Sequence, residues 1–354
     1  MISNFVSKIK FFNLGYRYEK KQEILKKLNN FSKKIVYKIN KGNNKKISYF
    51  SFGKKNKTKK FYIIQRNSFN TGFFSNFTYV LNHLLIAKKK KFIPVIDMKN
   101  FPNLYNERNK INNTYNSWKY YFEAVSKYKL EEVYKSKNVF FSSGKFLKNF
   151  IQNSGNLKFA PIIKKYIKIN SIIKNIEKKF YLKNFNNKIV LGVLFRGQDQ
   201  KYSPGHYLPP SVKQIIYKID TYLKKYNIDK IFIVTEEQKY LDVLKKKYPN
   251  KIIFYNSLRS YNTNRYYFYS RKNHRYLLGK EILIEMLLLS KCDYVVGTNT
   301  NVIETAKLFS LVNNNRIQFD YINNGLNSKN PFIRRWLWDF KNILPSYLGG
   351  FKTK

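Results

Sequence analysis

Short apolar runs alternate with segments of helical periodicity along most of this chain, and this alternation restricts the fold more than any other feature. In the second half the apolar runs cover residues 189–195, 230–234, 252–255 and 294–296. Segments with apolar residues at helical spacing lie between and after them, at 212–223, 240–244, 282–289 and 302–308. Consecutive parallel strands need a crossover, usually a helix, so this order predicts a parallel sheet covered on both faces.

The first half has a shorter version of the same pattern. We predict strands at 61–64, 92–96 and 139–141, and a helix that includes residues 77–85. Pro94 lacks a backbone N–H, which favours an outer position or an irregularity for its strand. The α/β pattern is expected to begin at Lys60.

A length of 354 residues suits two domains of ordinary size. We expect a basic lead-in over 1–58 that ends in the charge run Lys54 to Lys60. An N-terminal α/β domain with a helical connection would follow over 59–185, and a second α/β domain over 186–330. The last segment, 331–354, is predicted to be a C-terminal helix or tail.

The net charge of +49 by itself indicates an anionic partner, such as nucleic acid, an anionic membrane surface or a phosphorylated substrate. The lysines are spread along the whole chain, however, and they accompany abundant Asn, Ile, Tyr and Phe. All of these residues have A/T-rich codons. We therefore interpret the charge as general surface charge, with a weak attraction to anionic lipid of about 1 kcal/mol per nearby lysine.

Cys292 is the single cysteine, which excludes a disulfide within the chain and a Cys-rich zinc site. Basic residues interrupt the first 24 residues, so no signal peptide is predicted. The most apolar stretch, Ile282 to Leu289, is too short to span a bilayer. We expect a cytoplasmic protein, or one that is peripheral at the membrane.

Ligands of open α/β sheets bind beyond the carboxyl ends of the strands, which directs attention to Arg196. Arg196 directly follows an apolar strand, and an arginine there can form two parallel hydrogen bonds to a diphosphate. Gly197 would allow the backbone to approach such a ligand. Alternatively, Arg196 forms a structural ion pair with Asp199.

Other candidate residues follow neighbouring strands. His206 lies in a proline-rich loop and would contact a ligand or serve as a surface residue. Thr235 and Glu236 would bind a ligand, or else Thr235 caps a helix with acidic residues in its first turn. Thr298 and Thr300 precede a helix, a position that suits phosphate.

Two further signals come from other parts of the chain. Gly72 and Asn76 form a turn into a helix after the first predicted strand. Glu285 is a charge on an otherwise apolar helix, so it is expected to be paired or functional. No residue spacing indicates a metal site, and the chain has neither a P-loop nor a GxSxG motif.

Taken together, residues 188 to about 308 resemble the fucosyltransferases with a GT-B-like fold. These are the α1,6-fucosyltransferase and nodulation-protein group and, more distantly, the protein O-fucosyltransferases, with bacterial O-fucosyltransferase-like proteins most similar. A Gly-Val-His-Val-Arg-Arg-type segment of the family matches residues 192–197. Arg196 thus stands where the family holds the diphosphate of GDP-fucose. Other positions of this chain also match positions of the family: Asp199, His206, Thr235 to Glu237, Glu285, Thr300 and the segments 71–76 and 94–105.

The resemblance implies two Rossmann-like domains whose parallel sheets face a central cleft, with residues 186–330 as the nucleotide-sugar donor domain. It implies an inverting, metal-independent transfer of fucose from GDP-fucose to a glycan acceptor, with no cofactor. Arg196 would neutralise the leaving diphosphate, and Asp199 is the first candidate for the base. This chain departs from the family pattern at three points. Leu194 stands in place of a family His, and Gly197 stands in place of a second Arg. The Glu proposed as the base in the family has no counterpart here.

Three alternatives stay open at this point. The chain could be an enzyme of the same fold with another nucleotide-sugar donor or another acceptor hydroxyl. It could be a basic nucleic-acid-binding protein, which would bind polyanions with a steep salt dependence. It could also be a member of the family that binds the donor without transferring it.

Overall fold

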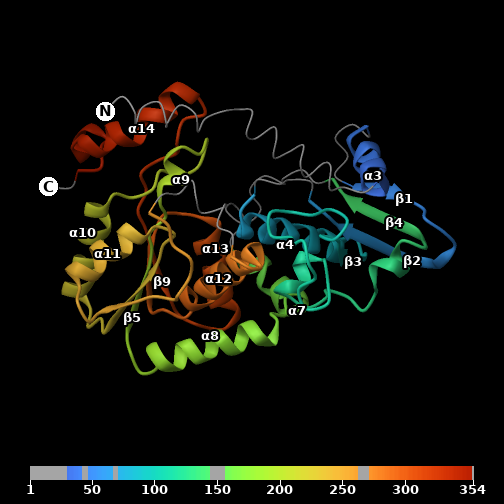
Figure 1. The fold of residues 1–354 in the computed structure, drawn as a ribbon, viewed down its shortest axis with the longest axis horizontal. Coiled ribbons are helices and arrows are strands. Elements are labelled where there is room, and N and C mark those ends of the chain that lie inside the picture. The colour runs from blue at the N-terminus through green and yellow to red at the C-terminus, as the bar shows by residue number, and fades with distance from the viewer. Residues whose placement is uncertain (1–29, 42–46, 67–70, 144–155, 262–270, 353–354) are drawn as a thin grey trace. The chain divides into compact units, whose positions relative to one another are not determined.

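The computed structural model describes residues 30–41, 47–66, 71–143, 156–261 and 271–352, which are drawn in colour in Figure 1. The chain divides into two compact units between Lys148 and Asn149. Within these ranges, each unit contains one sheet of mainly parallel strands, four in the first unit and five in the second. The predicted α/β class with two mainly parallel sheets is therefore confirmed.

The sheet of the first unit has the strand order β1-β4-β2-β3, in which β2 is parallel to both of its neighbours and β1 is antiparallel to β4. Pro94 lies in β3, at the edge of this sheet, where a residue without an N–H is tolerated. The described elements are α3 (Asn30–Lys41), β1 (Ile47–Phe50), β2 (Lys55–Ile64), α4 (Phe73–Lys89), β3 (Ile93–Ile96), η1 (Ser117–Tyr120), α5 (Leu130–Val133) and β4 (Ser136–Ser142).

The expectation that the sheet begins at Lys60 is wrong, because β2 starts at Lys55 and β1 precedes it. Most of the first half of β2 is exposed, so it carries no apolar signal. Its pairing with β4 shifts register between Lys55 and Lys60. Asn56 stabilises this irregular stretch, since its side-chain amide donates to Glu132 Oε1 at 3.0 Å and to Ser136 Oγ at 3.1 Å.

The sheet of the second unit is parallel throughout and has the order β7-β6-β5-β8-β9. Its central strand β5 lies between β6 and β8 and is buried at every position. The elements are η2 (Asn156–Lys158), α7 (Ala160–Tyr166), α8 (Ser171–Asn184), β5 (Val190–Leu194), α9 (Gln198–Lys201), α10 (Val212–Lys225), β6 (Lys230–Val234), α11 (Gln238–Lys247), β7 (Ile252–Ile253), α12 (His274–Leu289), β8 (Tyr294–Gly297), α13 (Asn301–Val312), β9 (Gln318–Tyr321), α14 (Pro331–Ile343) and η4 (Ser346–Leu348).

The strands and helices predicted for the second half are confirmed, with some changes in extent. Helix α12 begins at His274, eight residues before the predicted helical segment 282–289. Strand β7 has two residues, fewer than the predicted run 252–255, and its pairing with β6 ends at Ile253. Strand β9 was not predicted, since its four residues are mostly half-buried and only two are apolar. Within the described ranges, no helix has both the length and the apolar character needed to cross a bilayer.

Candidate functional site

The carboxyl ends of three neighbouring strands of the second unit lie in one row. Leu194 of β5 is paired with Val234 of β6 on one side and with Gly297 of β8 on the other. The residues that follow these strands therefore leave the sheet at the same edge, where open α/β sheets bind their ligands. Six predicted site residues emerge there: Arg196, Gly197, Thr235, Glu236, Thr298 and Thr300.

The carboxylate of Glu236 connects two of these strand ends. Its Oε1 accepts a hydrogen bond from the backbone N–H of Gly197 at 2.9 Å and lies 3.5 Å from Arg196 Nε. The Arg196 side chain is 25% exposed and that of Glu236 is 15% exposed. An ion pair with so little exposure holds the guanidinium in place more firmly than a surface pair does.

The structure identifies Glu236 as a carboxylate partner of Arg196. The alternative partner, Asp199, belongs to helix α9, but its side chain lies outside the described residues. Glu236 was expected to bind a ligand, and in the described ranges its carboxylate contacts Gly197 and Arg196.

Gly197 is required by the packing of its neighbour Glu237. A Cβ atom at position 197 would overlap the carboxylate of Glu237, whose side chain is fully buried. The Glu237 N–H in turn donates to Thr235 Oγ1 at 3.2 Å, and helix α11 begins after Glu237. Thr235 was predicted to cap this helix, but the N-cap is Glu237, two residues later. The Thr235 hydroxyl instead accepts its hydrogen bond within the turn that precedes α11.

The turn between β8 and α13 combines a capped helix with a buried, unsatisfied hydroxyl. Thr300 is the N-cap of α13, and its hydroxyl accepts from the Ile303 N–H at 3.4 Å. Thr298 Oγ1 and Asn299 Oδ1 are buried without a hydrogen-bond partner within the described part of the chain. A buried polar atom left unpaired costs about 1–3 kcal/mol, so a ligand that binds Thr298 Oγ1 would recover this energy.

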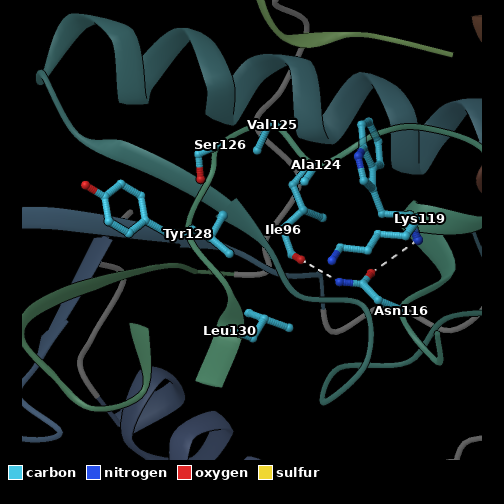
Figure 2. Close-up of a pocket in the computed structure, with 10 residues that line it drawn as sticks. Ile96, Asn116, Lys119, Ala124, Val125, Ser126, Tyr128 and Leu130 are labelled. Atoms are coloured by element: carbon cyan, nitrogen blue, oxygen red, sulfur yellow. Dashed lines mark hydrogen bonds between the residues drawn. The ribbon is translucent and has the colours of Figure 1, made fainter. Parts of the chain in front are cut away.

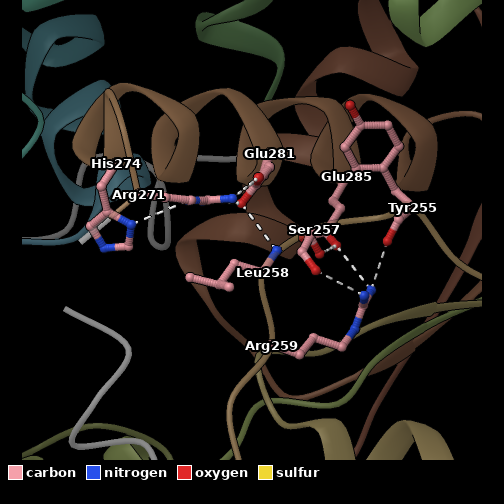
Figure 3. A network of polar contacts seen from close by, with 8 residues as sticks. All are labelled: Tyr255, Ser257, Leu258, Arg259, Arg271, His274, Glu281 and Glu285. Carbon is pink, nitrogen blue, oxygen red and sulfur yellow. Dashed lines mark hydrogen bonds and ion pairs between the residues drawn. The ribbon is translucent and has the colours of Figure 1, made fainter. Parts of the chain in front are cut away.

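Glu285 of α12 belongs to a buried network that holds the segment after β7 (Figure 3). Its Oε1 accepts from Ser257 Oγ at 2.6 Å and lies 3.6 Å from Arg259 Nη2. The guanidinium of Arg259 also donates to the carbonyl oxygens of Ser257, at 3.1 Å, and Tyr255, at 2.9 Å. This network fixes residues 255–259 against α12.

A second ion pair lies one helical turn before Glu285 (Figure 3). Arg271 forms a bidentate pair with Glu281, with N–O distances of 2.7 and 2.8 Å, and its Nε donates to His274 Nδ1 at 3.2 Å. Glu281 also accepts from the Leu258 N–H at 3.2 Å. Two carboxylates of one helix therefore hold the same loop.

The loop held by α12 is joined to the strand end that carries Glu236. The Ser260 N–H donates to the Glu236 carbonyl oxygen at 3.0 Å, and the Gln238 N–H donates to the Ser260 carbonyl oxygen at 3.0 Å. Sequence reasoning missed Ser257, Arg259 and Arg271. The presence of Glu285 on an apolar helix indicated that a partner exists, but nothing local in the sequence identified it.

The pKa of Glu285 is raised to about 7, mainly by burial and to a smaller extent by the charges of Glu281 and Glu236. The Arg259 guanidinium and the Ser257 hydroxyl act in the opposite direction and lower it. Burial is the largest of these effects because it removes the carboxylate from water.

His206 lies in an exposed turn that backbone hydrogen bonds attach to residues 325–327. The Asn327 N–H donates to the His206 carbonyl oxygen at 2.7 Å, and the Gly205 N–H donates to the Asn327 carbonyl oxygen at 3.2 Å. The imidazole is thus carried on a fixed loop that follows α9.

Gly72 and Asn76 belong to the first unit, at the start of α4. Gly72 is the helix N-cap, with extended dihedral angles that any residue can adopt and open space where a Cβ would lie. Asn76 Oδ1 accepts from Thr71 Oγ1 at 2.7 Å and from Arg66 Nη1 at 3.1 Å. Arg66 was not predicted. It is buried at the end of β2, and burial lowers its pKa to about 10.

The first unit also contains a small pocket at the end of β3 (Figure 2). Its lining is mainly apolar and includes Ile96, Trp118 and the polar residue Asn116. The Asn116 side-chain amide donates to the Ile96 carbonyl oxygen at 2.8 Å. Val95 and Ile96, which line this pocket, belong to the matched segment 94–105, whereas none of the individually named candidate residues lines it. No cluster of three or more His, Cys, Asp or Glu side chains suited to a metal occurs in the described ranges.

Comparison with known proteins finds similarity at the level of structure alone. No protein-family model and no curated protein matches the chain. The structure of NodZ alpha-1,6-fucosyltransferase soaked with GDP-fucose matches 71% of this chain and 92% of NodZ, with a TM-score of 0.46 and 15% identity. The fucosyltransferase NodZ from Bradyrhizobium matches 70% and 92%, with a TM-score of 0.45 and 16% identity. POFUT1 in complex with GDP matches 74% of each chain, with a TM-score of 0.36 and 13% identity.

The chain is similar in structure to fucosyltransferases. This is the resemblance that the motifs between residues 188 and 308 predicted. The similarity concerns the α/β architecture of two mainly parallel sheets. The assignment of individual residues rests on the contacts described above.

The unsatisfied hydroxyl of Thr298 leads to a first prediction. Thr298→Val removes a buried hydroxyl that has no hydrogen-bond partner among the described residues, so it should raise the free energy of unfolding by about 1 kcal/mol. Thr305→Val is the matched control, because the Thr305 hydroxyl is buried but donates to the Asn301 carbonyl oxygen at 2.6 Å. That control should lose about 1 kcal/mol in urea unfolding. A similar loss in both variants would contradict our interpretation of Thr298.

The raised pKa of Glu285 leads to a second prediction. The folded state holds this proton more tightly than the unfolded state, in which the ordinary pKa is 4.5. Relative to Glu285→Gln, the wild-type protein should therefore be most stable below about pH 4.5. It should lose about 3 kcal/mol as the pH rises to 7.

Urea unfolding of both proteins across this pH range measures the difference. Glu131→Gln is a control that removes an exposed carboxylate, with 69% of its side chain accessible. Parallel stability curves for wild type and Glu285→Gln would contradict the raised pKa.

Proposed function

We propose that this chain is a glycosyltransferase that uses GDP-fucose as donor and transfers fucose to a glycan acceptor, with inversion and without a metal. The observation that carries the proposal is the position of Arg196. Glu236 holds this arginine at the centre of a row of strand ends, where open α/β sheets bind ligands. A fixed cation there suits a substrate that carries a diphosphate.

The chemistry needs stabilisation of a leaving anion. An acceptor hydroxyl oxygen attacks the anomeric carbon of fucose while the bond from that carbon to the diphosphate oxygen breaks. The hydroxyl proton passes to a base, and GDP leaves with the electron pair. In our proposal Arg196 neutralises the charge that develops on the diphosphate, and this electrostatic contribution is the largest one. Asp199 is the proposed base, on the grounds of sequence resemblance.

The β8–α13 turn supports the same proposal. The amino terminus of a helix favours anions, and α13 begins directly after the buried hydroxyl of Thr298. We assign Thr298 to the donor diphosphate, with Thr300 capping the helix so that its first N–H groups keep their direction. Thr235 and Gly197 shape the neighbouring turns. His206 completes the proposed donor contacts of the second unit.

Glu236 and Glu285 act as positioning residues in this proposal. Glu236 orients Arg196 directly. Glu285 acts through Arg259 and the segment that pairs with the end of β6. We further propose a cytoplasmic location, because the single cysteine fits a reducing compartment.

Replacement of Arg196 tests the proposal directly. Arg196→Ala should lower kcat for transfer from GDP-fucose about 100-fold or more while the protein stays folded. Arg196→Lys should retain part of the activity, since it keeps a charge but loses the planar fork. Arg316→Ala is the matched control, because Arg316 is exposed and precedes β9, at the opposite end of the sheet. Near-normal turnover by folded Arg196→Ala would refute the site assignment.

The donor can be identified by ligand-induced stabilisation. GDP at about 100 times its Kd should add about 2.7 kcal/mol to the free energy of unfolding, whereas UDP, CMP and ADP should add little. Thr298→Val should reduce the effect of GDP. Preferential stabilisation by another nucleotide would indicate the same fold with a different donor. Tight RNA binding with a steep salt dependence, and no effect of GDP, would instead indicate a nucleic-acid-binding protein.

A further inference from the structure

Helix α14 exposes a row of large apolar side chains to solvent. Phe332, Ile333, Trp336, Phe340 and Ile343 are between 54% and 83% exposed. Their spacing of three and four residues places them along one face of the helix. Exposed apolar surface of this extent on one element marks an interaction site more often than a scatter of single residues does.

The opposite side of α14 is attached to the rest of the second unit. Trp338 Nε1 donates to the Pro209 carbonyl oxygen at 2.8 Å, and Lys201 Nζ lies 3.4 Å from the centre of the Trp338 ring. Both partners belong to the segment that carries His206. The helix is therefore held in place with its apolar face outward.

The chain after α14 folds back on the end of the helix and adds to this surface. The Phe351 N–H donates to the Lys341 carbonyl oxygen at 2.7 Å, and the Lys352 N–H donates to the Leu344 carbonyl oxygen at 3.1 Å. Within this turn Tyr347 is 77% exposed and Leu348 is 59% exposed. Aromatic side chains are thus prominent among the exposed groups of the whole C-terminal segment.

The charges of this segment are almost all positive. Residues 329–352 contain five basic side chains and one acidic side chain, Asp339. The guanidinium of Arg335 lies 5.4 Å from the ring centre of Trp336, so charge and apolar surface adjoin. The basic residues are Lys329, Arg334, Arg335, Lys341 and Lys352.

We propose that α14 docks on an anionic lipid bilayer, with Phe332, Trp336 and Phe340 inserted at the interface and the basic residues near the headgroups. Helices with Trp and Phe on one face and basic residues beside it bind in this way. A second copy of the chain is a poorer partner, because each copy carries a net charge of +49. The docking is specific to this helix, unlike a diffuse attraction of lysines spread over the surface.

Vesicle co-sedimentation of the full chain tests this assignment. The protein should bind vesicles of phosphatidylglycerol and phosphatidylcholine in equal amounts, and bind pure phosphatidylcholine weakly. The triple variant Phe332→Ser/Trp336→Ser/Phe340→Ser should bind the anionic vesicles more weakly than the wild type, by a factor of about ten or more. It should stay folded, because these side chains are exposed.

The matched control is Ile172→Ser/Leu182→Ser/Tyr217→Ser, which removes three exposed apolar side chains from α8 and α10. It should bind like the wild type. Trp336→Phe should also bind, but with a smaller blue shift of tryptophan fluorescence on vesicles than the wild type, which would identify Trp336 as inserted.

Three outcomes would overturn the proposal. The first is wild-type protein that does not bind anionic vesicles. The second is a triple variant that binds them as well as wild type does, which would mean that the lysines distributed over the chain are sufficient. The third is a wild-type oligomer that becomes monomeric in the triple variant without any vesicle binding, which would assign the apolar face to a second copy of the chain.

Discussion

The contact of Glu236 with the turn after β5 is the interaction on which the proposed site depends. Leu194 and Val234 are register partners, so the turns that follow them lie next to each other. A carboxylate from one turn can therefore accept from the backbone of the other and hold its arginine. Since an ion pair of low exposure keeps its geometry better than a surface pair, the guanidinium is preorganised before any ligand arrives.

Glu236 is itself supported by a chain of contacts that ends in helix α12. Its backbone carbonyl oxygen binds Ser260, whose neighbour Arg259 is held by Glu285 and by two carbonyl oxygens. A buried carboxylate and a buried guanidinium are each unfavourable alone, and each becomes tolerable beside the other. The raised pKa of Glu285 reflects this balance between burial and pairing.

Two positions at which this chain departs from the fucosyltransferase motif that its sequence resembles have physical explanations in this fold. Leu194, at the position of a family histidine, is fully buried between β6 and β8. Gly197, at the position of a second arginine, lies against the buried carboxylate of Glu237, so a side chain at this position would require Glu237 to move. The chain thus combines one fixed arginine with a compact turn. The apolar face of α14 belongs to the same unit, since Trp338 binds the segment that follows α9.

The alternation of apolar runs and helical segments determined the two mainly parallel sheets, because a strand or helix period is a local property of the chain. It also located Arg196 and Thr298 at strand ends. The tertiary structure alone decided which carboxylate meets Arg196 and which arginine meets Glu285, since these partners are 40 and 26 residues apart in the chain. It likewise joined β1 to the sheet and turned the apolar face of α14 outward, because strand register and helix orientation depend on packing between distant segments.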